Sequence, residues 1–206
     1  MLAVEREPAI VATMFGPQSD LVRAFTEALA DEGERRGLIG PLELPRLWTR
    51  HIINSGLIAP LLRGSIADVG SGAGLPGLVA AIARPDLQFT LVEPMERRVE
   101  WLDKQVKRLD LSNVNVLRVR AEEAPKGAFD MVTARAVGAL VKLLPITAPL
   151  LRSGGELALL KGASVEGELD KASKTIRKHR LLDVRIELLG DGMPTEPTRV
   201  FRARVD

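Results

Sequence analysis

The sequence predicts an α/β fold with a mostly parallel, seven-stranded sheet, an N-terminal helical cap and an antiparallel C-terminal hairpin. Short apolar runs alternate with helical stretches from residue 65 onward, which is typical of parallel sheets. A glycine-rich segment follows the first of these runs, and no helix separates the last two. We expect one compact domain, with the cap over residues 1–64 and the core over residues 65–206.

The segment before the first strand is predicted to be helical. Apolar residues recur at helical spacing within residues 1–36, and a loop rich in glycine and proline separates this part from a helix over residues 47–62. That second helix carries His51, Asn54 and Ser55 on a shared face. Two interpretations of this face stay open: a polar rim packed near the glycine-rich segment, or a wall of the substrate mouth.

Strands and helices then alternate through the core. Strands are expected at residues 66–69, 88–92, 114–119, 129–133, 156–160, 182–189 and 199–205. Helices are expected at residues 78–83, 95–109, 140–151 and 165–179. Gly154 and Gly155 are expected to turn the chain into the fifth strand. The last two strands have no crossover helix between them, so they must pair antiparallel.

Residues 65–77 predict a strand, a tight turn and the start of a helix. Four glycines fall within eight residues of this segment: Gly70, Gly72, Gly74 and Gly77. Glycine permits positive φ and leaves no Cβ between the backbone and a ligand, and the helix N-terminus offers free N–H groups. The alternative is a purely structural glycine turn, which only closes a corner between a strand and a helix.

A second signal lies about 20 residues further on, at the spacing of a nucleotide-binding βαβ unit. The strand over residues 88–92 ends in Glu93, which can accept hydrogen bonds from both hydroxyls of a ribose. Together, the glycine turn and Glu93 predict a ligand that contains a nucleoside. If the turn is only structural, Glu93 is an exposed acid.

Three later strands each deliver a cation to the same edge of the sheet, namely Arg120, Arg135 and Lys161. Because the carboxyl ends of parallel strands open onto the ligand crevice, this repetition favours a functional rim over scattered charges. The helix over residues 165–179 also places lysines on one face. That face is either an ordinary exposed surface or one that contacts phosphates.

The composition excludes several classes. The 206 residues include no Cys and no Tyr, and the net charge is only +2, which is weak support for a nucleic-acid partner. Without Cys there are no disulfides or zinc–thiolate sites, and we expect no metal. Gly72, Gly74 and Gly77 do spell a dinucleotide motif, but short-chain dehydrogenases need Tyr and zinc dehydrogenases need Cys. No apolar run approaches the roughly 18 residues of a membrane span, and no secretory signal is visible, so we expect a cytoplasmic protein.

The predicted layout resembles the class I S-adenosylmethionine-dependent methyltransferase (Rossmann-like) fold. The segment Asp-Val-Gly-Ser-Gly-Ala-Gly-Leu-Pro-Gly at 68–77 resembles the signature of the bacterial small-subunit rRNA guanine-N7 methyltransferase family, RsmG, also called GidB. Segments similar to other motifs of that family lie at residues 50–55, 120–123, 133–136 and 159–162. The resemblance extends from about residue 20 to residue 205.

Two departures from that family concern the substrate mouth. Residues 41–45 read Pro-Leu-Glu-Leu-Pro where the family often has Asn-Leu-Thr, and Asn54 replaces an Asp. The glycine loop and Glu93 show no such departure.

The resemblance implies that the protein binds S-adenosylmethionine and releases S-adenosyl-L-homocysteine. The cofactor-binding residues predicted on this basis are Gly70, Gly72, Gly74, Leu75, Glu93, Ala121, Glu122 and Arg135. The implied substrate is a loop guanine of 16S rRNA, free or in a small ribosomal subunit particle, and we expect the enzyme to be a monomer. Arg135, Arg120 and Lys161 are assigned to positioning the substrate through phosphates or guanine O6.

Guanine N7 carries an in-plane lone pair and no proton, so the implied reaction needs alignment rather than a base or a Cys nucleophile. Few aromatic residues are available to stack on RNA bases, and Trp48 and Phe15 are the candidates. Two alternatives stay open: an S-adenosylmethionine-dependent methyltransferase of small molecules, and a nucleotide-binding module without catalysis.

Overall fold

The computed structural model of the protein describes residues 3–206. Residues 1 and 2, which belong to the predicted N-terminal helix, lie outside this range. A seven-stranded sheet with the order β3-β2-β1-β4-β5-β7-β6 forms the centre. Its strands are β1 Ser65–Val69, β2 Gln88–Val92, β3 Val114–Leu117, β4 Phe129–Arg135, β5 Leu151–Lys161, β6 Leu181–Leu189 and β7 Thr198–Val205. Strands β1 to β5 pair in parallel, and β7 runs antiparallel to both β5 and β6, which confirms the predicted fold class.

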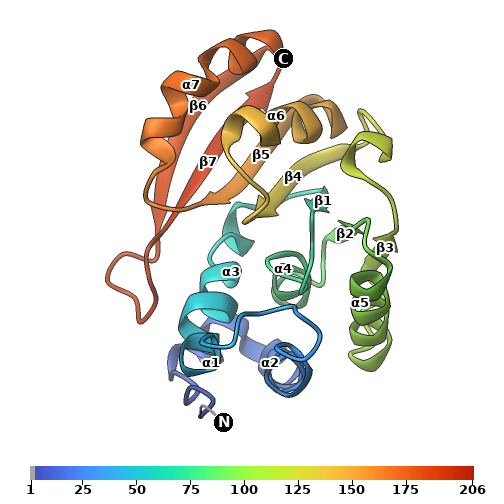
Figure 1. The fold of residues 1–206 in the computed structure, drawn as a ribbon, viewed down its shortest axis with the longest axis vertical. Helices are drawn as coiled ribbons and strands as arrows, with labels where there is room; N and C mark the ends of the chain where they lie inside the picture. The colour runs from blue at the N-terminus through green and yellow to red at the C-terminus, as the bar shows by residue number, and fades with distance from the viewer. Residues whose placement is uncertain (1–2) are drawn as a thin grey trace.

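Helices cover both faces of the sheet (Figure 1). One apolar cluster joins one face to α1 Ile10–Phe15, α2 Ser19–Glu32, α4 Gly77–Ala83 and α5 Glu96–Arg108. A second cluster joins the other face to α6 Leu140–Thr147 and α7 Val165–Lys178. Strands β2 and β3 lie on one side of β1 and strands β4 and β5 on the other, so the connections change direction at β1. Ligands bind at this kind of switch point in open α/β sheets.

The N-terminal helices are shorter and are interrupted more often than predicted. Helix α1 ends at Phe15, before Gly16, whose φ is +50°, and the short turn η1 Gly16–Gln18 leads into α2. The continuous helix predicted over residues 47–62 is also wrong in its extent. It consists of a π-helical segment, η3 Leu47–Ile53, then α3 Asn54–Gly56 and η4 Ala59–Leu61. Pro60 lacks the N–H that a continuous helix needs, which explains the last break.

Strand β5 begins before the expected glycine turn. The chain does not turn at Gly154 and Gly155, because both belong to β5, and the pairing with β4 shifts register between Phe129 and Met131. Between the pairs Phe129–Leu151 and Met131–Glu156, β5 advances five residues while β4 advances two, and Gly154, whose φ is +74°, lies in this irregular segment. The glycines predicted to turn the chain thus lie inside one long strand, directly before its regular pairing with β4 resumes at Glu156.

Trp101 connects the helical layer to the glycine-rich segment. Its side chain is fully buried and packs at a tilted angle on Phe25, with 6.4 Å between the ring centroids. Its indole Nε1–H donates a hydrogen bond of 3.0 Å to the carbonyl oxygen of Ala73. A buried Trp from α5 thus supports the loop that follows β1. Within residues 3–206, no helix is long and apolar enough to cross a membrane.

Asn113 gives a test of this architecture. Its buried amide donates to the carbonyl oxygens of Ala81, Arg84 and Leu87, and so closes the C-terminal end of α4 against β3. We expect Asn113→Ala to lower the free energy of unfolding by about 2 kcal/mol, because buried carbonyls lose their donor. Urea denaturation measures this change.

The matched control is Asn115→Ala, two residues further along, where the side chain is exposed. Its expected effect is within about 0.5 kcal/mol. Equal losses in the two variants would contradict the role given to Asn113.

Candidate active site

The glycine loop between β1 and α4 is shaped by its backbone and its neighbours. The N–H groups of Gly70 and Ser71 donate to the carbonyl oxygen of Val92, at 2.8 and 3.3 Å, and so attach the loop to the end of β2. Gly70 has a φ of +70°, and a Cβ there would lie 2.9 Å from the side chain of Val137. A side chain at this position would both strain the backbone and fill the space beside Val137.

Glu93 is buried at the end of β2 and is bound by two backbone amides. One carboxylate oxygen accepts from the N–H of Gly72 and the other from the N–H of Met95, both at 2.9 Å. The guanidinium of Arg98 lies 3.7 Å from the carboxylate. The interpretation of Glu93 as an exposed acid is therefore wrong. A carboxylate has about four lone-pair sites, so two of them stay available to a ligand.

A cavity of about 680 Å³ opens beside the glycine loop and Glu93. It is lined by Val69, Gly70, Val92, Glu93, Pro94, Met95, Arg98, Arg120, Ala121, Glu122, Arg135, Ala136, Val137 and Ile146. Five of the predicted cofactor-binding residues lie in this lining: Gly70, Glu93, Ala121, Glu122 and Arg135. The volume is in the range of small-molecule sites, and the lining combines apolar walls with a few polar groups.

The other three predicted cofactor residues lie elsewhere. Gly72 and Leu75 line an adjoining cavity of about 220 Å³. It shares four lining residues with the larger one: Gly70, Arg98, Arg135 and Ala136. Gly74 lines neither, and a Cβ there would come within 2.5 Å of Leu78. Packing against Leu78 therefore explains why a glycine stands at position 74, and the contact of Gly74 with a cofactor stays a prediction.

Arg135 lines both the large cavity and the adjoining one of about 220 Å³. Its guanidinium donates to Ser55 Oγ at 2.9 Å and to His51 Nδ1 at 2.7 Å. Because a guanidinium only donates, Nδ1 must accept, and the proton of the imidazole must sit on Nε2. Nε2 then donates to Glu43 at 2.6 Å. His51 is neutral and bonded on both ring nitrogens in this chain of contacts.

The electrostatics of this group follow from burial. Burial first, and then the charge of Arg135, lower the pKa of His51, although Glu43 opposes the shift. Burial also lowers the pKa of Arg135 to about 10, and the nearby charge of Arg50 adds to the effect. On the face predicted to be a polar rim or a wall of the substrate mouth, His51 and Ser55 accept hydrogen bonds from Arg135, and Asn54 and His51 line cavities.

The three cations predicted to form one rim differ in their surroundings. Arg120 is exposed at the mouth of the large cavity. Lys161 donates to the carbonyl oxygen of Gly138 at 2.6 Å and pairs with Glu168 of α7 at 3.0 Å. Its charge is therefore neutralised locally, and Arg135 is partly buried. The three side chains do not form one open basic rim.

A further cavity of about 360 Å³ lies where β4, β5 and the β6–β7 loop meet. It is lined by Arg50, Asn54, Arg135, Ala136, Leu160, Lys161, Gly162, Ala163, Glu196, Pro197, Thr198 and Arg199. Arg135 and Ala136 also line the large cavity, so the two spaces meet at the end of β4. The site is thus made of two compartments with a shared wall.

Sequence reasoning missed the acids of this site. Glu43 lies in the segment that departs from the family pattern, and it binds His51 eight positions away. Glu196 lies in the β6–β7 loop, and Asn54, the other departure, donates to its backbone carbonyl at 3.0 Å. Neither acid stands in a recognisable motif. Trp48 and Phe15, the stacking candidates, are both buried, so neither offers a free ring face.

Asp68 is the remaining acid beneath the glycine loop. It is fully buried, one oxygen accepts from the N–H of Gly77 at 3.1 Å, and the other has no partner. Burial raises the pKa of Asp68 to about 7, which the Gly77 N–H partly opposes. No group of three or more metal-binding side chains is found within the described residues 3–206.

The pKa of Asp68 gives a prediction for stability. Because the pKa is raised on folding, the folded state binds the extra proton between about pH 4 and pH 7, so this contribution to stability is lost progressively over that range and is gone above pH 7. Asp68→Asn should remove this dependence. We expect the stability of the wild type to fall relative to Asp68→Asn as the pH rises from about 5 to 7, by at most about 1.4 kcal/mol per pH unit, and to level off above pH 7. Urea denaturation between about pH 5 and pH 8 measures it.

Asp86→Asn is the control, because the salt bridge of Asp86 with Arg84 lowers its pKa and its contribution changes only in acid. Parallel pH profiles for the wild type and Asp68→Asn would refute the assignment.

Comparison with known proteins identifies close relatives over nearly the whole chain. The family model described as GidB, rRNA small subunit methyltransferase G, matches residues 18–195. A "Ribosomal RNA small subunit methyltransferase G" of Clavibacter michiganensis is 58% identical, over 99% of this chain and 98% of that protein. A protein of the same name from Corynebacterium glutamicum strain R is 44% identical, over 96% of this chain and 91% of that protein.

Solved structures share the fold at low sequence identity. A predicted O-methyltransferase, Atu636 of Agrobacterium tumefaciens, superposes with a TM-score of 0.59 at 21% identity, over 73% of this chain and 80% of that chain. The tRNA (m1A58) methyltransferase TrmI of Aquifex aeolicus gives 0.56 at 18% identity, over 74% and 68%. At these identities the likeness shows the class I methyltransferase fold alone.

Proposed function

We propose that this chain, which belongs to the rRNA small subunit methyltransferase G family, transfers the methyl group of S-adenosylmethionine to N7 of a guanine in 16S rRNA. The single observation that carries this function beyond the family is the two-compartment site. A nucleoside-sized cavity at the switch point of the sheet adjoins a second cavity through Arg135 and Ala136. A methyl donor and a base can therefore meet at the end of β4.

The residues of the large cavity fit S-adenosylmethionine. The two free lone-pair sites on the Glu93 carboxylate suit the hydroxyls of a ribose. Val92, Val137 and Ile146 offer apolar contact to an adenine, and Glu122 supplies an acceptor for its amino group. Gly70 leaves the backbone bare beside the cavity.

The reaction requires that the methyl donor and the guanine base be aligned. S-adenosylmethionine supplies a methyl group on a sulfonium, and guanine N7 can take it without prior loss of a proton. His51 is bonded on both ring nitrogens and is therefore not free to act as a base. The chain's own contribution is to fix Arg135 through His51 and Ser55, and to bring the two cavities together.

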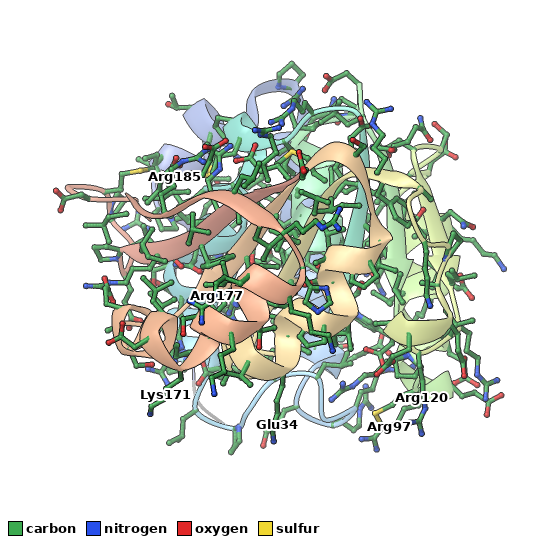
Figure 2. All side chains as sticks on the ribbon, turned by 90° about the horizontal axis from the view of Figure 1, so that it is seen from above. Glu34, Arg97, Arg120, Lys171, Arg177 and Arg185 are labelled. Atoms are coloured by element: carbon green, nitrogen blue, oxygen red, sulfur yellow. The ribbon has the colours of Figure 1, made fainter. Side chains whose placement is uncertain are left out.

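Exposed cations near the large cavity are available to RNA phosphates. Arg97 and Arg120 are exposed and form no ion pair within residues 3–206, and Figure 2 shows them at the same corner of the molecule. Lys171 and Arg177 on α7 lie on the opposite side of that view. We assign phosphate contacts to Arg120, and O6 or phosphate contacts to Arg135 and Lys161.

Both cavities are complete within one chain, which supports a monomer, and a substrate in the ribosome supports a cytoplasmic site of action.

The cofactor assignment is tested at Glu93. We expect Glu93→Gln to raise the Kd for S-adenosyl-L-homocysteine at least about tenfold, because the ribose loses a charged acceptor. Isothermal titration calorimetry measures the Kd. Glu96→Gln, exposed at the start of α5, is the control and should bind as the wild type does. An unchanged Kd in a folded Glu93→Gln protein rules out the ribose contact.

The function itself is tested in cells. Deletion of the gene should remove one N7-methylguanine from 16S rRNA, and the intact gene should restore it, whereas a copy with Arg135→Ala should not. Mass spectrometry of nuclease fragments, or borohydride and aniline cleavage at N7-methylguanine, maps the site. The proposal fails if the methylation pattern is the same with and without the gene.

A further inference from the structure

We propose that the cavity of about 360 Å³ between β4, β5 and the β6–β7 loop receives the target guanine, and that Glu196 accepts hydrogen bonds from guanine N1–H and N2–H₂. This inference rests on the proposed function, from which it takes guanine as the methyl acceptor. It adds the place of the base and the residue that distinguishes guanine from adenine.

The position of the cavity fits a base that is to be methylated. Its wall at Arg135 and Ala136 is also a wall of the large cavity, so a base in it has one edge beside the methyl donor. Its volume is at the lower end of small-molecule sites, which suits a single flipped nucleotide.

The charges of the cavity fit a guanine nucleotide. Its lining contains four cations and, among the described residues, a single carboxylate, that of Glu196. Three of the cations already pair with acids: Lys161 with Glu168, Arg199 with Glu166, and Arg50 with Glu43 and Glu196. Arg135 donates to Ser55 and His51 instead, so its charge is the one available to a nucleotide. Guanine presents two donors, N1–H and N2–H₂, on the edge away from N7, and a carboxylate is a two-oxygen acceptor. Adenine instead has an acceptor at N1. The lone pair of that nitrogen would face a lone pair of the Glu196 carboxylate, and the two would repel each other.

The opposite edge of guanine must stay open at N7. Arg135 uses Nη1 on Ser55 and part of Nη2 on His51. Its remaining N–H groups can donate to O6. An Arg clamped on both O6 and N7 would block the lone pair that takes the methyl group. The tether through His51 and Ser55 thus limits how Arg135 meets the base.

Glu196 is held by its backbone while its side chain stays available. Asn54 donates to the Glu196 carbonyl at 3.0 Å, and Thr195 Oγ1 donates to the Thr49 carbonyl at 2.6 Å, so the loop is attached to η3 and α3. In Figure 1 this loop projects beyond the sheet on the side of α3. The carboxylate pairs with Arg50 at 3.1 Å, but its side chain is 64% exposed. Exposed pairs are weak, so an entering base can displace Arg50.

The reaction itself favours a carboxylate here. The N7–methyl bond forms as the sulfur–methyl bond breaks, the sulfonium becomes a neutral thioether, and the positive charge passes to the guanine ring. N1–H becomes a stronger donor as this charge develops, so a carboxylate on that edge stabilises the transition state. The nearby acids Glu43 and Glu168 are already bound to His51 and Lys161.

The first experiment compares Glu196→Gln with Asp191→Asn, an exposed acid of the same loop that does not line the cavity. Single-turnover methylation is measured on small ribosomal subunits from cells that lack the gene. We expect the rate with Glu196→Gln to fall at least tenfold at saturating S-adenosylmethionine, with an unchanged Kd for S-adenosyl-L-homocysteine. Asp191→Asn should react as the wild type does. Equal rates for the wild type and Glu196→Gln overturn the inference and leave the proposed function intact.

The second experiment needs no methyl transfer. GMP, IMP and AMP are titrated into protein loaded with S-adenosyl-L-homocysteine, and amide NMR shifts are followed. GMP should shift the signals of Asn54, Lys161 and Glu196, IMP should bind more weakly because it lacks the N2 amino group, and Glu196→Gln should abolish the difference. If the wild type leaves rRNA unmethylated yet binds GMP in this way, the proposed function fails and the guanine cavity stands. Equal shifts with AMP and GMP refute the cavity assignment.

Discussion

Two backbone amides on one buried carboxylate hold together the glycine loop and the end of β2 that line the large cavity. Glu93 receives the N–H of Gly72 from the glycine loop and the N–H of Met95 from the start of α5. A buried carboxylate is costly without such donors, and the loop amides would otherwise lack acceptors, so each stabilises the other. One strand away, Asp68 binds the same loop through one oxygen only, which accepts from the N–H of Gly77. The ends of β1 and β2 therefore fix the loop conformation before any ligand arrives.

The second half of the site depends on Arg135, which carries the link between the two cavities. A partly buried cation at the end of β4 needs partners, and Arg135 finds them in a neutral imidazole and a hydroxyl rather than in a carboxylate. Glu43 sits one step further out and fixes the tautomer of His51. This arrangement keeps the charge of Arg135 available to a substrate, because no acid in direct contact neutralises it.

The sequence predicts the fold well because strand–helix alternation and the final hairpin are local patterns. The sequence also predicts residues that line the large cavity, because Glu93 and Arg135 stand at the ends of β2 and β4 and Ala121 begins the short turn after β3. It could not reveal that Lys161 is neutralised by Glu168, because only the packing of α7 brings them together. Glu196 lies 142 residues from Asn54, so no local pattern connects it to the site. The glycines of β5 predict a turn because the irregular segment of this strand uses a positive φ at Gly154, as a turn does.

The contact between Trp101 and Ala73 has an optical consequence. The chain contains two Trp and no Tyr, so its near-ultraviolet emission comes from Trp48 and Trp101 alone. The indole N–H of Trp101 is bonded to the carbonyl of Ala73 within the glycine loop, and the ring is fully buried. Any shift of that loop changes the polarity and bonding of this fluorophore. With Trp48 replaced by Phe, the protein carries a single intrinsic reporter attached to its own glycine loop, and needs no added dye.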